Sequence, residues 1–125
     1  GLGVAIDYVQ QFSWKKIKKY EIDLFAYALK KLIDQVQIIG PADIDKQCGI
    51  LSFVIDGIHA HDVAEIFSRH QVAVRAGHHC AMPLMTQLNI SGTVRLSFGL
   101  YNSIEDIDRV IEVIKEIKKI FIYYG

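Results

Sequence analysis

Residues 93–98 read Thr93-Val94-Arg95-Leu96-Ser97-Phe98, in which polar and apolar side chains alternate strictly. Because successive side chains of a β-strand point to opposite faces of the sheet, this alternation predicts a strand with one face on the core. Residues 72–75, Val72-Ala73-Val74-Arg75, follow the same pattern. Each of these two strands is therefore expected to direct one arginine, Arg75 or Arg95, away from its apolar face.

Two apolar stretches upstream predict two more strands. Residues 49–56 are rich in Ile, Leu, Phe and Val, are too few for a good helix, and end in the turn dipeptide Asp56-Gly57, which indicates a buried strand. Cys48 begins the longest apolar stretch, residues 48–55, and is expected to lie in this strand and to pack as a small hydrophobe. Residues 37–39 precede Gly40-Pro41, which stops a helical pattern, and they fit a short strand with a turn.

Apolar residues spaced three and four apart predict the helices, because this spacing lines one side of an α-helix. Residues 14–36 carry such a row, residues 61–70 carry a short one, and residues 103–121 carry the clearest one. The last helix starts at Ser103, with Asp106 three residues later as a capping-box-like partner. Its expected core row is Ile104, Ile107, Ile111, Ile114, Ile117 and Phe121.

The order of these elements predicts the fold class. Helix, helix, strand, strand, helix, strand, short helix or loop, strand and helix follow one another, so we expect helices to cover one face of a small, mostly antiparallel sheet. This is an α+β fold, a two-layer sandwich. Nothing in the sequence covers the other face, which should carry Arg75 and Arg95, and we expect something else to dock there.

Composition limits the class of protein. The 125 residues, 51% hydrophobic and 22% charged, suffice for one domain, 1–125. Fourteen Lys and Arg balance fourteen Asp and Glu, so neither nucleic acid nor an anionic membrane is indicated as a partner. The longest apolar stretch is far shorter than the roughly 20 residues of a membrane-spanning helix. Two cysteines make no disulfide framework and no signal sequence opens the chain, so a cytoplasmic location is expected.

The densest group of chemically active residues is Arg75-Ala76-Gly77-His78-His79-Cys80-Ala81-Met82-Pro83. Two imidazoles and an arginine close to Cys80 could favour its thiolate, which is the nucleophilic form. The alternative is a buried structural cysteine with two ordinary loop histidines. Arg95 has two readings as well, since it could lie on a solvated outer face or hold a carboxylate in two parallel hydrogen bonds.

A zinc site is a further alternative. The stretches His59-Ala60-His61 and His78-His79-Cys80 together offer nitrogen and sulfur ligands of the kind that zinc prefers. Their spacing matches no closed zinc-finger motif, and the chain has neither a Cys-x-x-Cys nor a His-Glu-x-x-His pattern. We therefore predict no metal ligands.

The run from Val74 to Ala81, with Val94-Arg95-Leu96-Ser97-Phe98 and Leu100-Tyr101-Asn102-Ser103, closely resembles the C-terminal end of the SufS-type, group II cysteine desulfurases, a family that includes selenocysteine lyases. Residues 1–8 and 57–63 resemble further stretches of it, so the likeness covers nearly the whole chain. The Arg-Ala-Gly-His-His-Cys run separates this group from the desulfurases whose cysteine stands on a longer, serine-rich loop. Met82 departs from it, because many relatives have glutamine there.

The resemblance implies an aminotransferase class V enzyme of fold type I that uses pyridoxal 5'-phosphate (PLP) to convert L-cysteine, or L-selenocysteine, to L-alanine. By this resemblance Cys80 is the catalytic residue and becomes a persulfide, which passes to a sulfur-acceptor protein for iron–sulfur cluster assembly. Arg95 would bind the substrate carboxylate, and Arg75 would lie beside the cysteine loop. The full-length enzyme is expected to be a homodimer.

The resemblance also implies that the chain is incomplete. It begins with Gly1 rather than Met, and family members are roughly three times as long, so 1–125 is expected to be the C-terminal small domain without its large PLP-binding domain. No segment resembles the motif of the Schiff-base lysine, so this piece is expected to hold no cofactor and to be inactive alone. The alternative is a stand-alone binding module in which Cys80 and the histidines hold a metal or a partner.

Overall fold

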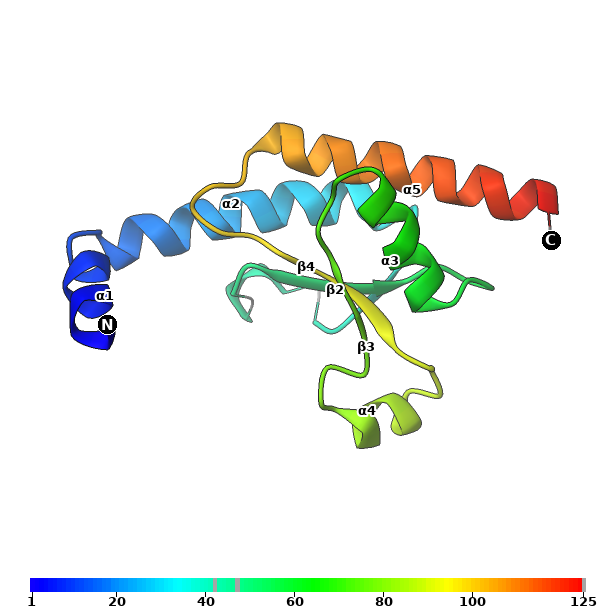
Figure 1. Ribbon diagram of the computed structural model, residues 1–125, viewed down its shortest axis with the longest axis horizontal. Helices are drawn as coiled ribbons and strands as arrows, with labels where there is room; N and C mark the ends of the chain where they lie inside the picture. Colours follow the sequence, from blue (N-terminus) through cyan, green and yellow to red (C-terminus); the bar gives the residue numbers. More distant parts are fainter. Residues whose placement is uncertain (42, 47, 125) are drawn as a thin grey trace.

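A computed structural model describes residues 1–41, 43–46 and 48–124 of the chain. Helices and strands follow one another in the predicted order (Figure 1). The elements are α1 (Leu2–Gln10), α2 (Trp14–Leu32), β1 (Gln37–Ile39), the 3-10 helix η1 (Ile44–Lys46), β2 (Ile50–Val54), α3 (Ala60–Arg69), β3 (Arg75–Gly77), α4 (Met82–Gln87), β4 (Thr93–Ser97) and α5 (Ile104–Tyr124). None of the helices in the described ranges is long and apolar enough to cross a membrane.

The four strands form one sheet in the order β1-β2-β4-β3, and every neighbouring pair is antiparallel. β4 lies between β2 and β3, so it is hydrogen-bonded on both sides. In this register Arg95 of β4 stands opposite Ser52 of β2 on one side and Arg75 of β3 on the other. The α+β sandwich with a small antiparallel sheet is therefore confirmed.

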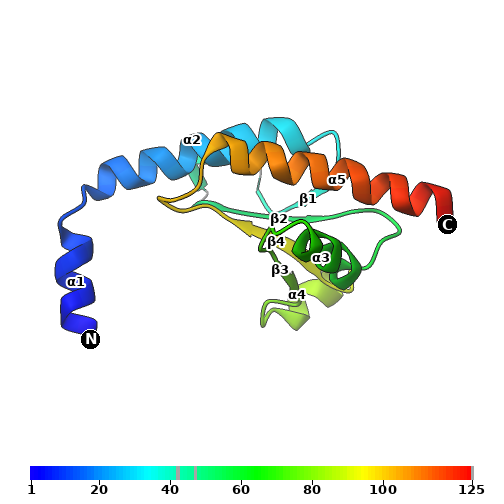
Figure 2. The same ribbon diagram turned by 45° about the horizontal axis from the view of Figure 1, so that its top comes forward.

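Helices α2, α3 and α5 cover one face of the sheet, with α2 and α5 side by side (Figures 1 and 2). The core between the layers includes Phe53 of β2 and Phe67 of α3, whose rings meet edge to face with centroids 6.5 Å apart. Replacing either aromatic ring by Ala would cost about 3–5 kcal/mol, the usual range for large core side chains. This layer supports the strands from which the candidate site is built.

The last helix follows its predicted pattern closely. The Ser103 amide donates to Asp106 Oδ2 at 3.0 Å, which satisfies one of the free backbone donors at the helix start. Ile107, Ile114 and Ile117 are almost fully buried. Ile104 is exposed, because it occupies the first turn, where the helix extends past the edge of the core, so its place in the predicted core row is wrong.

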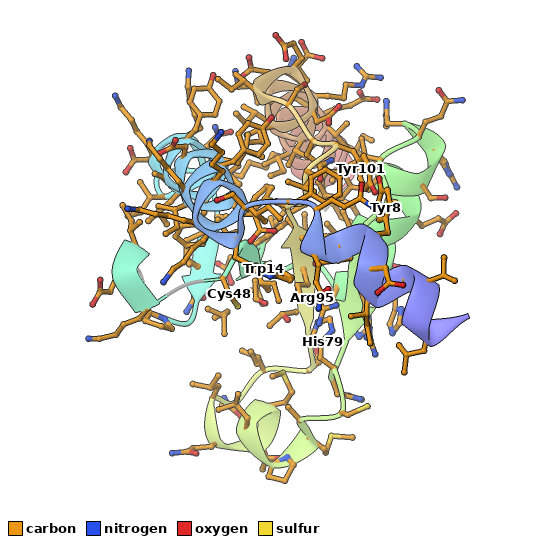
Figure 3. The ribbon with its side chains drawn as sticks, turned by 90° about the vertical axis from the view of Figure 1, so that its left-hand side faces the viewer. Tyr8, Trp14, Cys48, His79, Arg95 and Tyr101 are labelled. Atoms are coloured by element: carbon orange, nitrogen blue, oxygen red, sulfur yellow. The ribbon has the colours of Figure 1, made fainter. Side chains whose placement is uncertain are left out.

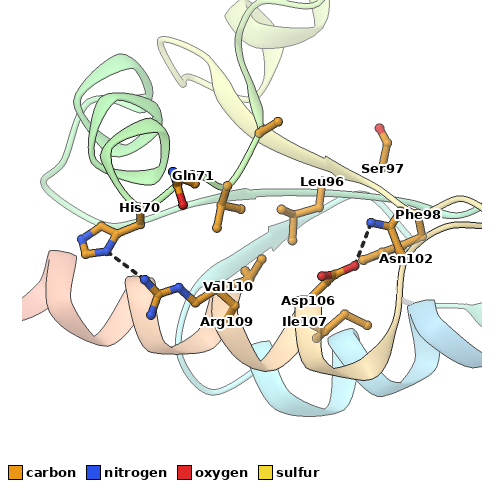
Figure 4. Close-up of a pocket in the computed structure, with 12 residues that line it drawn as sticks. His70, Gln71, Leu96, Ser97, Phe98, Asn102, Asp106, Ile107, Arg109 and Val110 are labelled. Atoms are coloured by element: carbon orange, nitrogen blue, oxygen red, sulfur yellow. Dashed lines mark hydrogen bonds between the residues drawn. The ribbon is translucent and has the colours of Figure 1, made fainter.

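Two predicted strand assignments need correction. Gly49 adopts φ +69, which turns the chain immediately before β2. Cys48 therefore lies outside the strand and is exposed rather than packed. Residues 72–74 lie outside β3, and Val72 and Ala73 line a cavity of about 430 Å³ next to α5 (Figure 4). The last predicted strand begins where β4 does, at Thr93.

Helix α1 stands apart from this sandwich. It extends from the start of α2 away from the sheet (Figures 1 and 2), and none of its residues is buried. Leu2 and Val4 are each more than 70% exposed, and Trp14 at the start of α2 is 64% exposed. An apolar helix without a buried face gains little tertiary stabilisation from the described part of the chain.

Candidate active site

Arg75 and Arg95 lie directly opposite each other on neighbouring strands. Val94 and Leu96, the neighbours of Arg95 in β4, are buried against the helices. Side chains alternate along a strand, so both arginines belong to the face that the helices leave uncovered. The sequence predicted this placement of both arginines. Two positive charges therefore lie directly opposite each other, which weakens the pairing of β3 with β4.

The guanidinium group of Arg95 is incompletely satisfied. The Arg95 side chain is half-buried, and its Nε is a buried atom without a hydrogen-bond partner among the described residues. A buried donor that lacks an acceptor costs free energy. A planar guanidinium also binds a carboxylate through two parallel hydrogen bonds. Arg95 with Arg75 beside it is therefore suited to an anion arriving at this face.

The loop after β3 holds Cys80 in an unusual backbone conformation. Gly77, at the end of β3, has φ +121, and both His79 and Cys80 have positive φ, at 54° and 62°. Positive φ is uncommon for residues with a Cβ and costs of order 1–3 kcal/mol where it is held in place. The Ala81 amide closes the turn by donating to the His78 carbonyl at 2.9 Å. Cys80 is a free, exposed thiol at the tip of this turn.

His79 connects this loop to β4. Its Nε2 lies 3.0 Å from Thr93 Oγ1 and 3.2 Å from the Thr93 carbonyl oxygen. Figure 3 shows His79 and Arg95 on neighbouring parts of this face. Burial, followed by the positive charges of Arg95 and Arg75, lowers the pKa of His79 below its ordinary value, and the bond to the Thr93 carbonyl opposes this shift. We therefore expect a neutral imidazole at neutral pH.

A shallow hollow of about 540 Å³ runs along the loop. It is lined by Arg75, residues 76–80, Met82 and Pro83, and also by His61 from the first turn of α3. The predicted residues Arg75 and Cys80 thus share one hollow. In the sequence His61 was named as part of a possible zinc site. Its place beside the cysteine loop depends on how α3 packs, which local sequence does not reveal.

The metal alternative finds no support in this geometry. Among the described residues, no group of three or more His, Cys, Asp or Glu side chains is placed to hold a metal ion. His59 accepts a hydrogen bond from the His61 amide as the N-cap of α3, and the rings of these two histidines stack with centroids 5.3 Å apart. Both residues therefore have a structural role at this helix start.

Sequence reasoning missed the partner of His79. Thr93 is 1% exposed, and its contact with His79 joins residues 14 positions apart. The alternation of residues 93–98 places Thr93 on the arginine face, but no local pattern shows that a loop histidine covers it.

The residues of the site include no lysine. Residues 47–114, which contain β2, β3, β4 and the cysteine loop, have none. An enzyme that holds an aldehyde cofactor as a Schiff base needs a lysine amine. The site therefore does not fit such a cofactor by itself, and any lysine of this kind would have to come from another segment.

Comparisons with known proteins place this chain in one family. The aminotransferase class V family model matches residues 1–110. A probable cysteine desulfurase of Staphylococcus aureus strain Mu50 is 44% identical over 125 residues, which cover 98% of this chain and 30% of that protein. The corresponding protein of Staphylococcus epidermidis strain ATCC 12228 is 42% identical over the same length. The chain therefore spans about a third of the length of these relatives.

Solved structures give the same picture. The apo structure of a cysteine desulfurase from Thermococcus onnurineus NA1 matches with a TM-score of 0.86 and 39% identity, over 91% of this chain and 29% of that one. The Escherichia coli cysteine desulfurase CsdA matches with a TM-score of 0.83 over 93% of this chain and 29% of that one. Its 24% identity supports the fold alone.

Proposed function

This chain belongs to the aminotransferase class V family, and from this membership we propose that it is the C-terminal part of a cysteine desulfurase. The observation that carries the proposal is the exposed Cys80 thiol on a turn with two successive positive φ angles, in the hollow that Arg75 also lines. A nucleophile and an anion-binding group on one uncovered face fit a small amino-acid substrate.

We assign the binding of the substrate carboxylate to Arg95, with Arg75 beside it. The buried Nε of Arg95 supports this role, because a bound carboxylate would accept the hydrogen bond that the described residues do not. The second guanidinium strengthens the local positive potential. Cysteine and selenocysteine share this carboxylate, so both are candidate substrates.

Cys80 then acts as the sulfur acceptor. Its thiolate attacks the substrate sulfur, a sulfur–sulfur bond forms, and the carbon–sulfur bond of the substrate breaks. The electron pair of that bond stays on the substrate carbon, which takes up a proton and leaves as alanine. Cys80 keeps the sulfur as a persulfide, which an acceptor protein would collect for iron–sulfur cluster assembly.

The remaining chemistry belongs to the longer protein. Cysteine desulfurases of this family use PLP, which stabilises negative charge on the substrate carbon. Residues 47–114 supply no lysine for it, so we propose that a large domain of the same chain holds the cofactor and that 1–125 is the small domain. The exposed apolar residues of α1 support a contact with that domain.

The finer assignments are part of the same proposal. The run Arg75-Ala76-Gly77-His78-His79-Cys80 supports the SufS-type group, and balanced charge with two free thiols supports a cytoplasmic location. We propose a homodimer for the full-length enzyme, by resemblance to its family. The 125-residue piece alone is expected to be inactive.

The test uses the full-length protein supplied with PLP and L-cysteine. We expect sulfide, in the presence of a reductant, and alanine in equal amounts, while the 125-residue piece releases neither. A full-length protein that binds PLP and consumes cysteine without forming alanine would overturn the proposal.

A further inference from the structure

The contact between His79 and Thr93 plays no part in the reaction proposed above. Resting on the proposed desulfurase function, we propose that His79 is a positioning residue, whose ring is anchored on Thr93 and thereby sets the position of the Cys80 thiol relative to Arg95.

The two contacts fix the tautomer of the imidazole. A carbonyl oxygen can only accept a hydrogen bond, so the Nε2 that lies 3.2 Å from the Thr93 carbonyl must carry the proton. The Thr93 hydroxyl oxygen, 3.0 Å away, is placed to accept from the same N–H. Nδ1 then holds a lone pair, and it is buried without a partner among the described residues. The ring therefore has one defined orientation against β4.

Thr93 is a rigid anchor. It is 1% exposed and is the first residue of β4, where it pairs with β3. Gly77 is its partner in the register with β3. A Cβ added to the neighbouring Gly92 would lie 3.1 Å from the Gly77 carbonyl carbon and oxygen, which is tighter than an ordinary contact, so the two backbones approach each other closely here. The base of the loop is therefore fixed at this point.

The tip of the loop lacks such support from the sheet. His79 and Cys80 follow each other with positive φ, and neither belongs to a strand or helix. A strained backbone persists where surrounding contacts hold it. The ring of His79 supplies such contacts one residue before the nucleophile, and Arg95 stands two residues after Thr93 on the same face of β4. The contact of His79 with Thr93 thus sets the position of the Cys80 thiol relative to Arg95.

This arrangement separates two steps of the reaction. Arg95 is held by the sheet whether or not His79 is present, so loss of the anchor should leave substrate binding nearly unchanged. The Cys80 thiol should instead sample many positions, and a displacement of about 1 Å can lower a reaction rate about 100-fold. The expected signature is a large loss in kcat for sulfur transfer with KM for cysteine close to that of the unchanged enzyme.

The experiment compares variants of the full-length enzyme loaded with PLP. His79→Ala removes both contacts, whereas His79→Gln keeps an N–H donor at about the same distance from the backbone. His70→Ala is the matched control, because His70 is also a half-buried imidazole with two polar partners, Arg109 and Glu116, and it lies in another part of the structure. Steady-state kinetics are combined with hydrogen–deuterium exchange of a peptide spanning residues 78–81, which needs no activity.

We expect His79→Ala to lower kcat about 10- to 100-fold with KM changed less than about threefold, and to speed exchange across residues 78–81. His79→Gln should show a smaller loss of kcat and a smaller rise in exchange. His70→Ala should change neither kcat nor exchange. Unchanged exchange in His79→Ala, or a rise in KM without a fall in kcat, would overturn the proposal. If the unmutated enzyme makes no alanine, the desulfurase function is refuted. Faster exchange in His79→Ala would in that case still support the role of His79 in holding the loop.

Discussion

Arg75 and Arg95 are directly paired across β3 and β4, with their side chains on the face of the sheet that the helices leave open. Two like charges in this relationship weaken strand pairing. They also produce a local positive potential that an anionic substrate would neutralise. The pair therefore lowers the stability of the sheet while it favours the binding of an anion. Single substitutions can measure these two effects separately.

Arg95→Ala should impair substrate capture far more than folding. In the full-length enzyme we expect KM for cysteine to rise about 10- to 100-fold, because hydrogen bonds to charged groups contribute about 1.5–3 kcal/mol each. Arg95→Lys should recover part of the loss, since an ammonium lacks the planar fork. Arg69→Ala, which breaks an exposed ion pair with Glu65 on α3, is the control. Normal kinetics of Arg95→Ala at low cysteine concentration would disprove the assigned role.

Arg75→Gln should have opposite effects on stability and on activity. Removal of the charge opposite Arg95 should raise the free energy of unfolding of the 125-residue chain by about 0.2–1 kcal/mol, the range for a cross-strand pair. The same change should raise KM for cysteine in the full-length enzyme. Urea unfolding and steady-state kinetics measure the two effects, and a less stable Arg75→Gln would show that the pair is not repulsive.

His79 should contribute a dependence of stability on pH. Its pKa is lowered in the folded state below the ordinary 6.5, mainly by burial and then by the nearby charges of Arg95, Arg75 and His78. The unfolded chain then binds a proton more readily, so stability rises with pH through this range. The contribution is fully present above about pH 6.5 and is lost as the pH falls through the folded pKa.

His79→Gln removes this titration. As the pH falls from about 7.5 to 5, the urea midpoint of the unchanged chain should therefore fall relative to that of His79→Gln. Taking this difference cancels the titration of the groups that both proteins share. A difference that stays constant over this range would contradict the lowered pKa.

Helix α1 should make the 125-residue chain self-associate. Its exposed apolar residues, with Trp14 next to it, need cover that the described residues do not provide. Trp14 is the single tryptophan, so its emission should shift to shorter wavelengths as concentration rises and association covers it. Deleting residues 1–12 should reduce the association seen in sedimentation. If the shortened and unshortened chains associate equally, α1 is not the contact surface.

The sequence predicted those features that depend on local periodicity. Alternation in residues 93–98 placed Arg95 opposite the core, and three–four spacing identified the buried row of α5. Cys48 was misplaced because the conformation of Gly49, which turns the chain away from β2, is not visible in an apolar run. The sequence did not predict the contact between His79 and Thr93, for a different reason. It joins a loop to a strand 14 residues away, and such a contact depends on the tertiary arrangement.

The transfer of sulfur from cysteine to Cys80 is tested most directly by mass spectrometry of the full-length enzyme after one turnover with ³⁴S-labelled cysteine. We expect an added sulfur atom on the peptide that contains Cys80. Cys80→Ser should abolish it while PLP stays bound, and Cys48→Ser, which alters the other exposed thiol, should leave it intact. A Cys80→Ser enzyme that still forms a protein persulfide at the normal rate would contradict the account.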